Sequence, residues 1–340
     1  MSEIWERRLE ELNKNKLSLA ILPTPIQKLN KLSEELGVNL WLKRDDLTGI
    51  ETAGNKIRKL EYTAAKALSE GAKVLITCGG IQSNHCRATA AVAARIGISS
   101  HLVLRTDEAS PLEGNYLLDK ILGAEITFVT RRQYATERNE IMAGIAADYE
   151  KQGIKAYVIP EGASDGVGNL GYINAVKEIT EQEKQLGINF NAIVSAVGSG
   201  GTYSGLYLGR KLYAPDKEVI SFNVCDDEAY FLDVCSRISQ DTVETLGLPI
   251  EVSKDDMCII DGYKGIAYAV STDEELAFIA EVARKEGVIL DPVYTGKAFY
   301  GLYQELKKGN LKEYENILFI HTGGLYGLFP KQEQFAKILL

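Results

Sequence analysis

The sequence predicts an α/β protein built on open, mostly parallel sheets flanked by helices. Short apolar runs alternate with stretches of helical periodicity along the chain, which is the pattern of parallel strands joined by helices. Several of these runs are apolar at consecutive positions, as expected of strands that are buried on both faces. A length of 340 residues fits two domains, or one large domain that carries an insertion.

Each strand candidate is a short apolar run. The candidates cover residues 38–44, 73–78, 100–105, 125–129, 156–160, 192–198, 219–225 and 317–322. Apolar residues at helical spacing fill most of the intervals between them, for example over 57–68, 88–96 and 171–186. Because open parallel sheets bind ligands at the carboxyl ends of their strands, the turns from strand to helix are the expected functional sites.

The composition excludes several classes of protein. A net charge of -9 argues against nucleic acid and anionic membranes as partners, since both require a basic surface. The first 16 residues contain no apolar signal core, and no apolar run is long enough to cross a bilayer, so a cytoplasmic protein is expected. The five cysteines form no C-x-x-C pair, so neither a zinc site nor a disulfide framework is predicted.

The turn after the strand at 192–198 has the composition of a phosphate-binding loop. Gly198, Gly200 and Gly201 lack side chains, so that backbone N–H groups can close around an anion. Ser199 and Thr202 add hydroxyl donors, and the helix that follows contributes the positive end of its dipole. The alternative is a glycine-rich turn without a ligand.

A dinucleotide-binding loop is the rival interpretation of the same segment. Gly198 and Gly200 have the required spacing, and Asp226 and Asp227 end the next strand, where a ribose-binding acid would stand. The third glycine of that motif should fall at position 203, but the residue there is Tyr203. A Walker loop is excluded because no lysine follows the glycines.

Four hydrogen-bonding side chains lie between a Gly-Gly pair and an alanine-rich helix: Gln82, Ser83, Asn84 and His85. Donors at a helix N-terminus make a site for a carboxylate. The alternative is a simple helix cap by Ser83 or Asn84. One cap does not need four such residues, so the carboxylate site is favoured. No metal is predicted here, because His85 and Cys86 have no third ligand nearby.

Two further positions raise chemical questions. Tyr294 and Thr295 open a helix after an apolar run, and a tyrosine hydroxyl there could act as a proton donor or nucleophile. The alternative is a core tyrosine with a satisfied hydroxyl. Lys56 lies in the first turn of another helix, where the helix dipole disfavours a cation. Its alternative is an ordinary solvated lysine.

These features together indicate pyridoxal phosphate. That cofactor carries a phosphate, attaches covalently to a lysine amine, and acts on amino acids whose carboxylate must be held. A phosphate loop without a nucleotide signature, a carboxylate site and a lysine at a helix start meet these three needs. Positive potential around Lys56 would lower the pKa of its amine toward the neutral form that reacts.

The sequence resembles the D-cysteine desulfhydrase and 1-aminocyclopropane-1-carboxylate deaminase family over nearly its whole length. The resemblance rests on the ordered motifs KRDDLTG (43–49), GNKIRKLEY (54–62), GGIQSNHCRATA (79–90), GSGGT (198–202), LDPVYTGKA (290–298) and IHTGG (320–324). It implies a pyridoxal-phosphate enzyme of the tryptophan-synthase-β type, also called fold type II. The chain departs at Ala53, where many members have a second glycine, and this concerns only a detail of the loop.

The resemblance also implies a domain organisation and a set of roles. A large domain is expected from residues 1–54 and 165–340, with a small α/β domain of residues 55–164 inserted in it, and the protein is expected to be a homodimer. The expected cofactor-binding residues are Lys56 at the covalent attachment point, Asn84 at the ring oxygen, and Gly198, Ser199, Gly200, Gly201 and Thr202 at the phosphate. The substrate carboxylate is assigned to Gln82, Ser83, Asn84 and His85. The expected catalytic residues are Lys56, Ser83, Tyr268 and Tyr294.

Two threonines favour the desulfhydrase side of the family. Deaminase-type members have a Glu after the tyrosine, which can keep the ring nitrogen protonated, and a Leu in the H-x-G-G segment. This chain has Thr295 and Thr322 at those positions, both expected near the ring nitrogen. Opening a cyclopropane requires a strong electron sink, whereas expelling a thiolate does not. The resemblance therefore implies conversion of D-cysteine to pyruvate, ammonia and hydrogen sulfide.

Other functions stay open on the sequence alone. Within the family, the alternatives are 1-aminocyclopropane-1-carboxylate deaminase activity and β-elimination of another amino acid, such as cysteate. From other classes, the alternatives are a cofactor- or amino-acid-binding protein without catalysis and a nicotinamide-dependent enzyme that uses the loop at 198.

Overall fold

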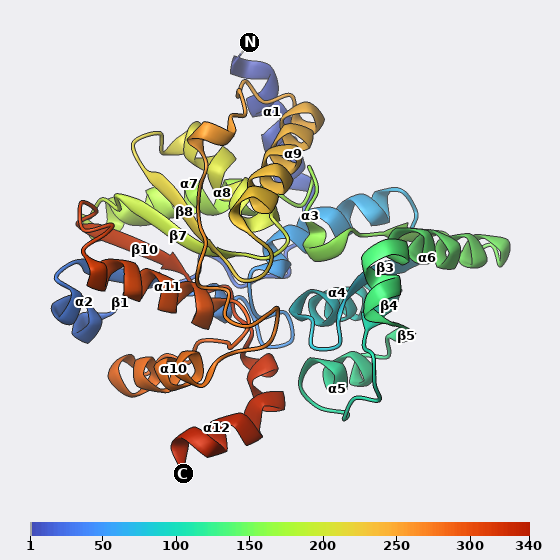
Figure 1. Cartoon of the computed structure of the whole chain (residues 1–340). Coiled ribbons are helices and arrows are strands. Elements are labelled where there is room, and N and C mark those ends of the chain that lie inside the picture. The colour runs from blue at the N-terminus through green and yellow to red at the C-terminus, as the bar shows by residue number, and fades with distance from the viewer. Residues whose placement is uncertain (1) are drawn as a thin grey trace.

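The computed structural model describes residues 2–340 and contains two separate sheets (Figure 1). The larger sheet has six strands, and all its neighbours are parallel except the first pair. Its strands, in spatial order, are β1 (Ile26–Lys28), β2 (Asn39–Lys43), β10 (Asn316–Ile320), β7 (Ala192–Val197), β8 (Glu218–Asn223) and β9 (Cys258–Ile260). The last strand in sequence, β10, therefore lies in the middle of this sheet.

The smaller sheet has four parallel strands drawn from one continuous stretch of chain. In spatial order they are β5 (Glu125–Val129), β4 (Ser99–Arg105), β3 (Val74–Gly80) and β6 (Ala156–Val158). This sheet lies on the right in Figure 1, beside α4 (Asn84–Arg95), α5 (Gly114–Ile121) and α6 (Arg131–Lys151). The chain thus leaves the larger sheet after β2 and returns to it at β7.

Helices cover both faces of the larger sheet, and each face has its own apolar core. One core packs against α7 (Leu170–Leu186), α8 (Gly201–Tyr213) and α9 (Glu228–Leu246). The other packs against α2 (Asn30–Leu36), α10 (Asp273–Glu286), α11 (Thr295–Lys308) and α12 (Gln332–Leu339). The remaining elements are α1 (Ser2–Asn15), α3 (Lys56–Ser69), and the short 3-10 turns η1 (Asp45–Leu47), η2 (Glu161–Ala163), η3 (Lys254–Asp256) and η4 (Leu325–Lys331).

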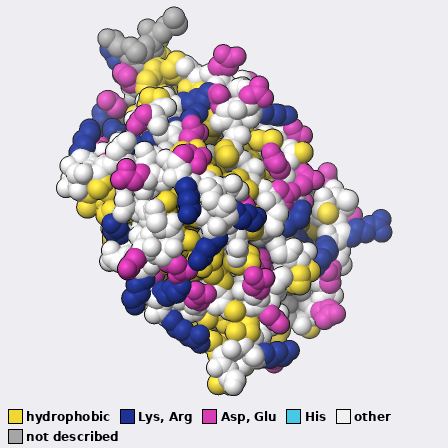
Figure 2. Space-filling model, turned by 60° about the vertical axis from the view of Figure 1, so that its left-hand side comes forward, with side chains coloured by type: hydrophobic (Ala, Val, Ile, Leu, Met, Phe, Trp, Pro, Cys, Tyr) yellow, Lys and Arg dark blue, Asp and Glu magenta, His cyan; other side chains and the backbone are white. Residues whose placement is uncertain are grey.

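The predicted α/β fold class is confirmed, and every predicted strand is present. Two strands were not predicted, β1 and β9, and each is only three residues long. Figure 2 shows basic and acidic side chains interspersed over the face that it draws. Among residues 2–340, no helix combines the length and apolar character needed to span a bilayer.

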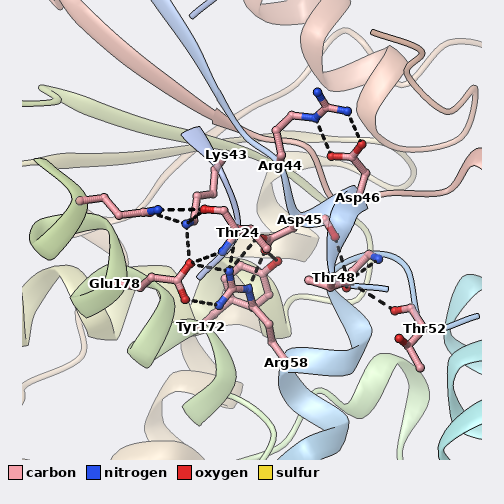
Figure 3. A network of polar contacts seen from close by, with 12 residues as sticks. Thr24, Lys43, Arg44, Asp45, Asp46, Thr48, Thr52, Arg58, Tyr172 and Glu178 are labelled. Carbon is pink, nitrogen blue, oxygen red and sulfur yellow. Dashed lines mark hydrogen bonds and ion pairs between the residues drawn. The ribbon is translucent and has the colours of Figure 1, made fainter. Parts of the chain in front are cut away.

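A buried network of charges holds the start of α3 (Figure 3). The Arg58 guanidinium donates to Asp45, at 2.9 Å to Oδ2 and 2.8 Å to Oδ1. It also donates to both carboxylate oxygens of Glu178 on α7, at 3.0 Å each. Lys43 also pairs with Glu178, and the Tyr172 hydroxyl donates to Asp45 at 2.6 Å. Two cations and two carboxylates thus bind the first turn of α3 to β2 and α7.

Candidate active site

A cavity lies at the carboxyl ends of strands from both sheets. It is lined by residues at the ends of β3 and β7, by the segment after β10, and by the starts of α3 and α4. The predicted residues in its wall are Lys56, Ser83, Asn84, His85, Gly198, Ser199, Gly200, Thr202, Tyr268, Tyr294 and Thr322. Three predicted residues are not part of this wall: Gln82, Gly201 and Thr295.

Lys56 is the first residue of α3, and a glycine before it sets its position. Gly54 has φ +110°, and a Cβ there would lie 2.5 Å from the carbonyl oxygen of Thr322. The N–H of Asn55 donates to that same carbonyl at 3.1 Å. The Gly-Asn-Lys turn therefore lies directly against the segment that follows β10, and only glycine fits the close approach.

The pKa of the Lys56 amine lies close to neutral pH. Its pKa falls to about 8, mainly because the surrounding protein withdraws it from water; Asp291 opposes this effect and the buried guanidinium of Arg87 adds to it. Sequence reasoning expected positive potential to be the cause, but burial contributes more. The amine donates to Asn55 Oδ1 at 2.9 Å, and Asn55 Nδ2 donates to Thr202 Oγ1 at 2.9 Å. Asn55 thus links the lysine to the glycine-rich loop.

The loop at 198–202 fits a phosphate group. Within the described chain, no backbone or side-chain acceptor pairs with the N–H groups of Ser199 and Gly200, which precede the first residue of α8. Gly200 has φ +87°, and a Cβ on Gly198 would lie 3.0 Å from a ring carbon of Tyr294. Free N–H groups at a helix start are the donors that phosphate oxygens require.

Ser83 and Asn84 direct donors into the cavity. Ser83 is the N-cap of α4, where its Oγ accepts the Cys86 N–H at 3.2 Å and its own proton stays available. Asn115 fixes the orientation of Asn84. Its Oδ1 accepts from Arg87 and its Nδ2 donates to Asn84 Oδ1 at 2.9 Å, so the Asn84 amide N–H groups face away from it. Both residues can therefore donate to an anionic ligand.

His85 lines the cavity as a neutral ring. The Thr77 hydroxyl donates to the carbonyl of Ile159 at 2.9 Å, so it must accept the 2.8 Å bond from His85 Nε2–H. That assignment leaves His85 Nδ1 as a buried acceptor, and no described residue donates to it. Burial lowers the pKa of His85 well below its usual value, and Lys56 and Lys59 add to this effect. The ring is thus an acceptor in the cavity and brings no positive charge for a carboxylate.

Two of the predicted residues make their hydrogen bonds to protein groups outside the cavity. Gln82 Oε1 accepts the N–H of Asn115 at 2.8 Å and its Nε2 donates to the carbonyl of Glu113 at 3.1 Å, so both ends hold the start of α5. The Thr295 hydroxyl donates to Asp291 Oδ1 at 2.7 Å and accepts the Asp291 N–H at 2.8 Å. Of the two threonines singled out in the sequence, only Thr322 therefore offers its hydroxyl to the cavity.

The two tyrosines form a pair beside the lysine. Their hydroxyl oxygens lie 2.6 Å apart and their rings meet edge to face. The Lys56 Nζ lies 5.7 Å from the centre of the Tyr294 ring. Burial raises the pKa of Tyr268 to about 12 and that of Tyr294 well above its usual value, so both hydroxyls keep their protons near neutral pH. The pair can donate a proton toward the cavity.

Asn55 and Glu161 are wall residues that sequence reasoning missed. Asn55 immediately precedes Lys56, and this adjacency is the signal that could have identified it. Glu161 lies in η2, after the shortest strand of the smaller sheet, and no motif marks it.

The comparison with known families decides the cofactor. A family model described as pyridoxal-phosphate dependent enzyme matches residues 17–323, which is most of the chain. The chain belongs to the pyridoxal-phosphate-dependent enzyme family. The free N–H groups of the 198–202 loop and the buried amine of Lys56 suit the phosphate and the aldehyde of that cofactor.

Several named relatives are similar over almost the whole chain. A bifunctional D-cysteine desulfhydrase/1-aminocyclopropane-1-carboxylate deaminase of Arabidopsis thaliana is 44% identical over 98% of this chain and 84% of its own length. A D-cysteine desulfhydrase of Yersinia pestis is 38% identical over 94% of this chain and 96% of its own. A crystal structure of an ACC deaminase homologue superposes with a TM-score of 0.89 at 40% identity, over 97% of this chain and 99% of that one.

Proposed function

We propose that this chain is a lyase that eliminates sulfide from D-cysteine and yields pyruvate, ammonia and hydrogen sulfide. One observation carries the proposal. The amine of Lys56, with a pKa of about 8, lines one cavity together with free N–H groups at the start of α8 and free donors at the start of α4. A reactive amine between two anion sites suits an amino acid bound beside pyridoxal phosphate. The names of these relatives support D-cysteine as the substrate.

The residues of the cavity have distinct roles in binding and in proton transfer. The N–H groups of Ser199 and Gly200 bind the phosphate, and Ser83 and Asn84 donate to the anionic oxygens of substrate and cofactor. When bound, pyridoxal phosphate supplies an aldehyde for the substrate amine and a ring that withdraws electrons from the α-carbon. Lys56 holds the cofactor between turnovers and removes the α-proton of the substrate, because its amine is largely neutral at mildly alkaline pH.

Thr322 favours the elimination of sulfide over the opening of a cyclopropane. It lines the cavity, and its hydroxyl has no charged partner among residues 2–340. A neutral hydroxyl cannot keep a ring nitrogen protonated as a carboxylic acid would. Loss of a thiolate does not need a strong electron sink, so the cavity suits D-cysteine better than an unactivated ring.

Deaminase activity is the second candidate, and the tyrosine pair supports it. Tyr268 and Tyr294 hold their hydroxyls 2.6 Å apart in the cavity wall, where either can donate a proton to a carbon or act as a nucleophile. Ring opening requires such a group, whereas sulfide elimination does not. The plant relative is named for both activities.

The deciding experiment is a substrate panel on the purified protein loaded with pyridoxal phosphate. Sulfide, pyruvate and ammonia are measured from D- and L-cysteine, and ammonia from 1-aminocyclopropane-1-carboxylate. We expect D-cysteine to have the highest kcat/KM and Lys56→Ala to abolish turnover. If the wild type opens the cyclopropane faster than it releases sulfide, the assignment passes to the deaminase. Wild-type activity in Lys56→Ala would show that the lysine does not have the proposed catalytic role.

We also propose the division into a large domain of residues 1–54 and 165–340 and a small domain of 55–164. The separate sheet formed by residues 74–158 supports it. We further propose that the protein is a cytoplasmic homodimer. Five unpaired cysteines suit a reducing compartment, and sedimentation of the holoenzyme measures the oligomeric state.

A further inference from the structure

Arg105 places a cation at the rim of the cavity. It is the last residue of β4 and pairs in register with Gly80, the last residue of β3. Gly80 lines the cavity, and a Cβ built on it would lie 3.6 Å from a terminal nitrogen of the Arg105 guanidinium. The same Cβ would lie 3.7 Å from a ring carbon of Tyr268. The guanidinium therefore lies next to the tyrosine pair, at the mouth of the site.

Two aromatic rings hold this guanidinium, but no carboxylate neutralises it. Its central carbon lies 5.2 Å from the ring centres of both Tyr134 and Tyr268. Among the described residues it makes neither an ion pair nor a side-chain hydrogen bond. Its neighbours differ, because Arg131 pairs with Asp107 at 3.4 Å and Arg138 lies 3.9 Å from Glu161. Stacking on two rings fixes Arg105 while its donors stay free.

A second cation faces the same hollow from another part of the chain. The hollow continues outward from Gly80 and Tyr268, and Lys331, at the end of η4, lines it together with Arg105. Lys331 has no ion-pair partner within the described chain. Two acids also line the hollow: Asp107 forms an ion pair with Arg131, and Glu108 is exposed. A molecule with a net charge of -9 thus keeps two unpaired cations at the mouth of its active site.

We propose that Arg105, assisted by Lys331, binds an anionic group on the β-carbon of the substrate, so that amino acids with a sulfonate or carboxylate side chain belong to the substrate class. The inference rests on the proposed β-elimination and decides among the substrates that the sequence leaves open. A guanidinium binds sulfonate or carboxylate oxygens through charge-assisted hydrogen bonds, whereas a neutral thiol gains little from it.

For cysteate the reaction balances without a further reagent. The α-proton is removed, the Cβ–S bond breaks, and its electron pair leaves with the sulfur as sulfite. Water then releases ammonium and pyruvate from the remaining carbon skeleton. No oxidant or reductant is consumed.

The test compares two substrates in the same holoenzymes. Pyruvate formation is measured from D-cysteine and from D- and L-cysteate in the wild type, Arg105→Gln, Arg105→Lys and the control Arg132→Gln, an exposed arginine on α6. We expect wild-type turnover of one cysteate enantiomer. Arg105→Gln should lower the ratio of kcat/KM for cysteate to that for D-cysteine by about tenfold or more, the range for a lost charge-assisted bond. Arg105→Lys should keep part of the ratio, and Arg132→Gln all of it.

Two outcomes overturn the inference while D-cysteine is still turned over. In one, neither cysteate enantiomer reacts or competes with D-cysteine. In the other, Arg105→Gln lowers both kcat/KM values equally, which would assign Arg105 to the α-carboxylate or to the fold. Cofactor absorbance of each variant shows whether the site is still assembled.

Failure of the proposed function gives a different result, namely no pyruvate from any amino acid of the panel. Calorimetric titration of the wild-type holoenzyme with cysteate and with alanine then still tests the hollow. Tighter binding of cysteate that is lost in Arg105→Gln supports the inference, and equal binding of the two amino acids refutes it.

Discussion

At the scale of single residues, the pKa of Lys56 sets how the proposed attachment of the cofactor depends on pH. Only the neutral amine attacks an aldehyde. With a folded-state pKa of about 8, the neutral fraction is nearly complete above that pH and falls by about tenfold for each unit below it. A solvated lysine would still be protonated at pH 9. The surroundings of Lys56, and its burial above all, therefore make the amine usable near neutrality.

We predict that the rate of covalent pyridoxal phosphate uptake by the apoprotein rises with pH, with a midpoint near 8. Arg87→Met removes a buried cation that lowers this pKa, so its midpoint should move to higher pH. Borohydride trapping at a series of pH values measures both proteins, and Lys56→Ala serves as the blank. An unchanged midpoint in Arg87→Met would show that the guanidinium does not lower the pKa of Lys56.

The residues of the site were predictable by type but not by orientation. Lys56 and the 198–202 loop carry their chemistry in the motif itself, so the sequence was sufficient to find them. Gln82 looked equivalent to its neighbours, yet its amide is occupied by groups of residues 113 and 115. Asp291 likewise occupies the hydroxyl of Thr295. Partners of this kind are set by packing between elements, which no single motif encodes.

At the scale of elements, the start of α8 requires a glycine at position 200. Gly200 has φ +87°, and a Cβ on it would meet Ile238 and Val234 at 2.9 and 3.0 Å. The residue thus turns the chain in a conformation that other residues rarely adopt, beneath two apolar side chains. This geometry leaves the N–H groups before α8 without intramolecular partners.

We predict that Gly200→Asp reduces pyridoxal phosphate affinity by more than about 100-fold. Its Cβ would collide with Ile238 and Val234 and displace the turn whose N–H groups suit the phosphate, and its charge would repel a phosphate nearby. Fluorescence titration of the apoprotein measures the affinity. Gly287→Asp is the control, since Gly287 has φ +69° at the end of α10 with open space around it. Equal losses in both variants would assign the effect to backbone strain alone.

The strands show where elements can be predicted from sequence and where they cannot. Runs such as 192–198 are almost entirely apolar because their strands lie between two layers of helices, and this pattern is specific. The short edge strands β1 and β9 contain too few residues to establish a pattern, and β1 has polar residues at two of its three positions. These two strands form because an adjacent strand pairs with them, and that pairing is set by the tertiary structure.

At the scale of the whole molecule, the network around Arg58 ties distant segments together. Its carboxylates come from residues 45 and 178, on opposite sides of the inserted sheet in sequence. Burial opposes ionisation of Asp45, but the Arg58 guanidinium outweighs it and holds the pKa of that carboxyl below its usual value. The contribution of this pair is therefore present at neutral pH and lost in acid.

We predict that Arg58→Met lowers the free energy of unfolding by about 3–5 kcal/mol, since it leaves Asp45 buried without its ion-pair partner and Glu178 with Lys43 alone. Urea denaturation at pH 7 measures the change. Arg95→Met is the matched control, because Arg95 pairs with Glu51 on the surface, where such pairs contribute below about 1 kcal/mol. A loss in Arg58→Met no larger than in this control would contradict the role of the network.

The central place of β10 has a consequence for biosynthesis. β10 pairs with β2 on one side and β7 on the other, so the larger sheet cannot close until residue 320 has left the ribosome. The smaller sheet is complete once residue 158 has emerged, and it can fold while translation continues. Until then β2 and β7 each present an unpaired edge to which another chain could add. Thr322 and the carbonyl that anchors Asn55 arrive only with this last strand. A prematurely terminated chain therefore lacks the assembled pocket, and binding of a reactive aldehyde waits for the finished polypeptide.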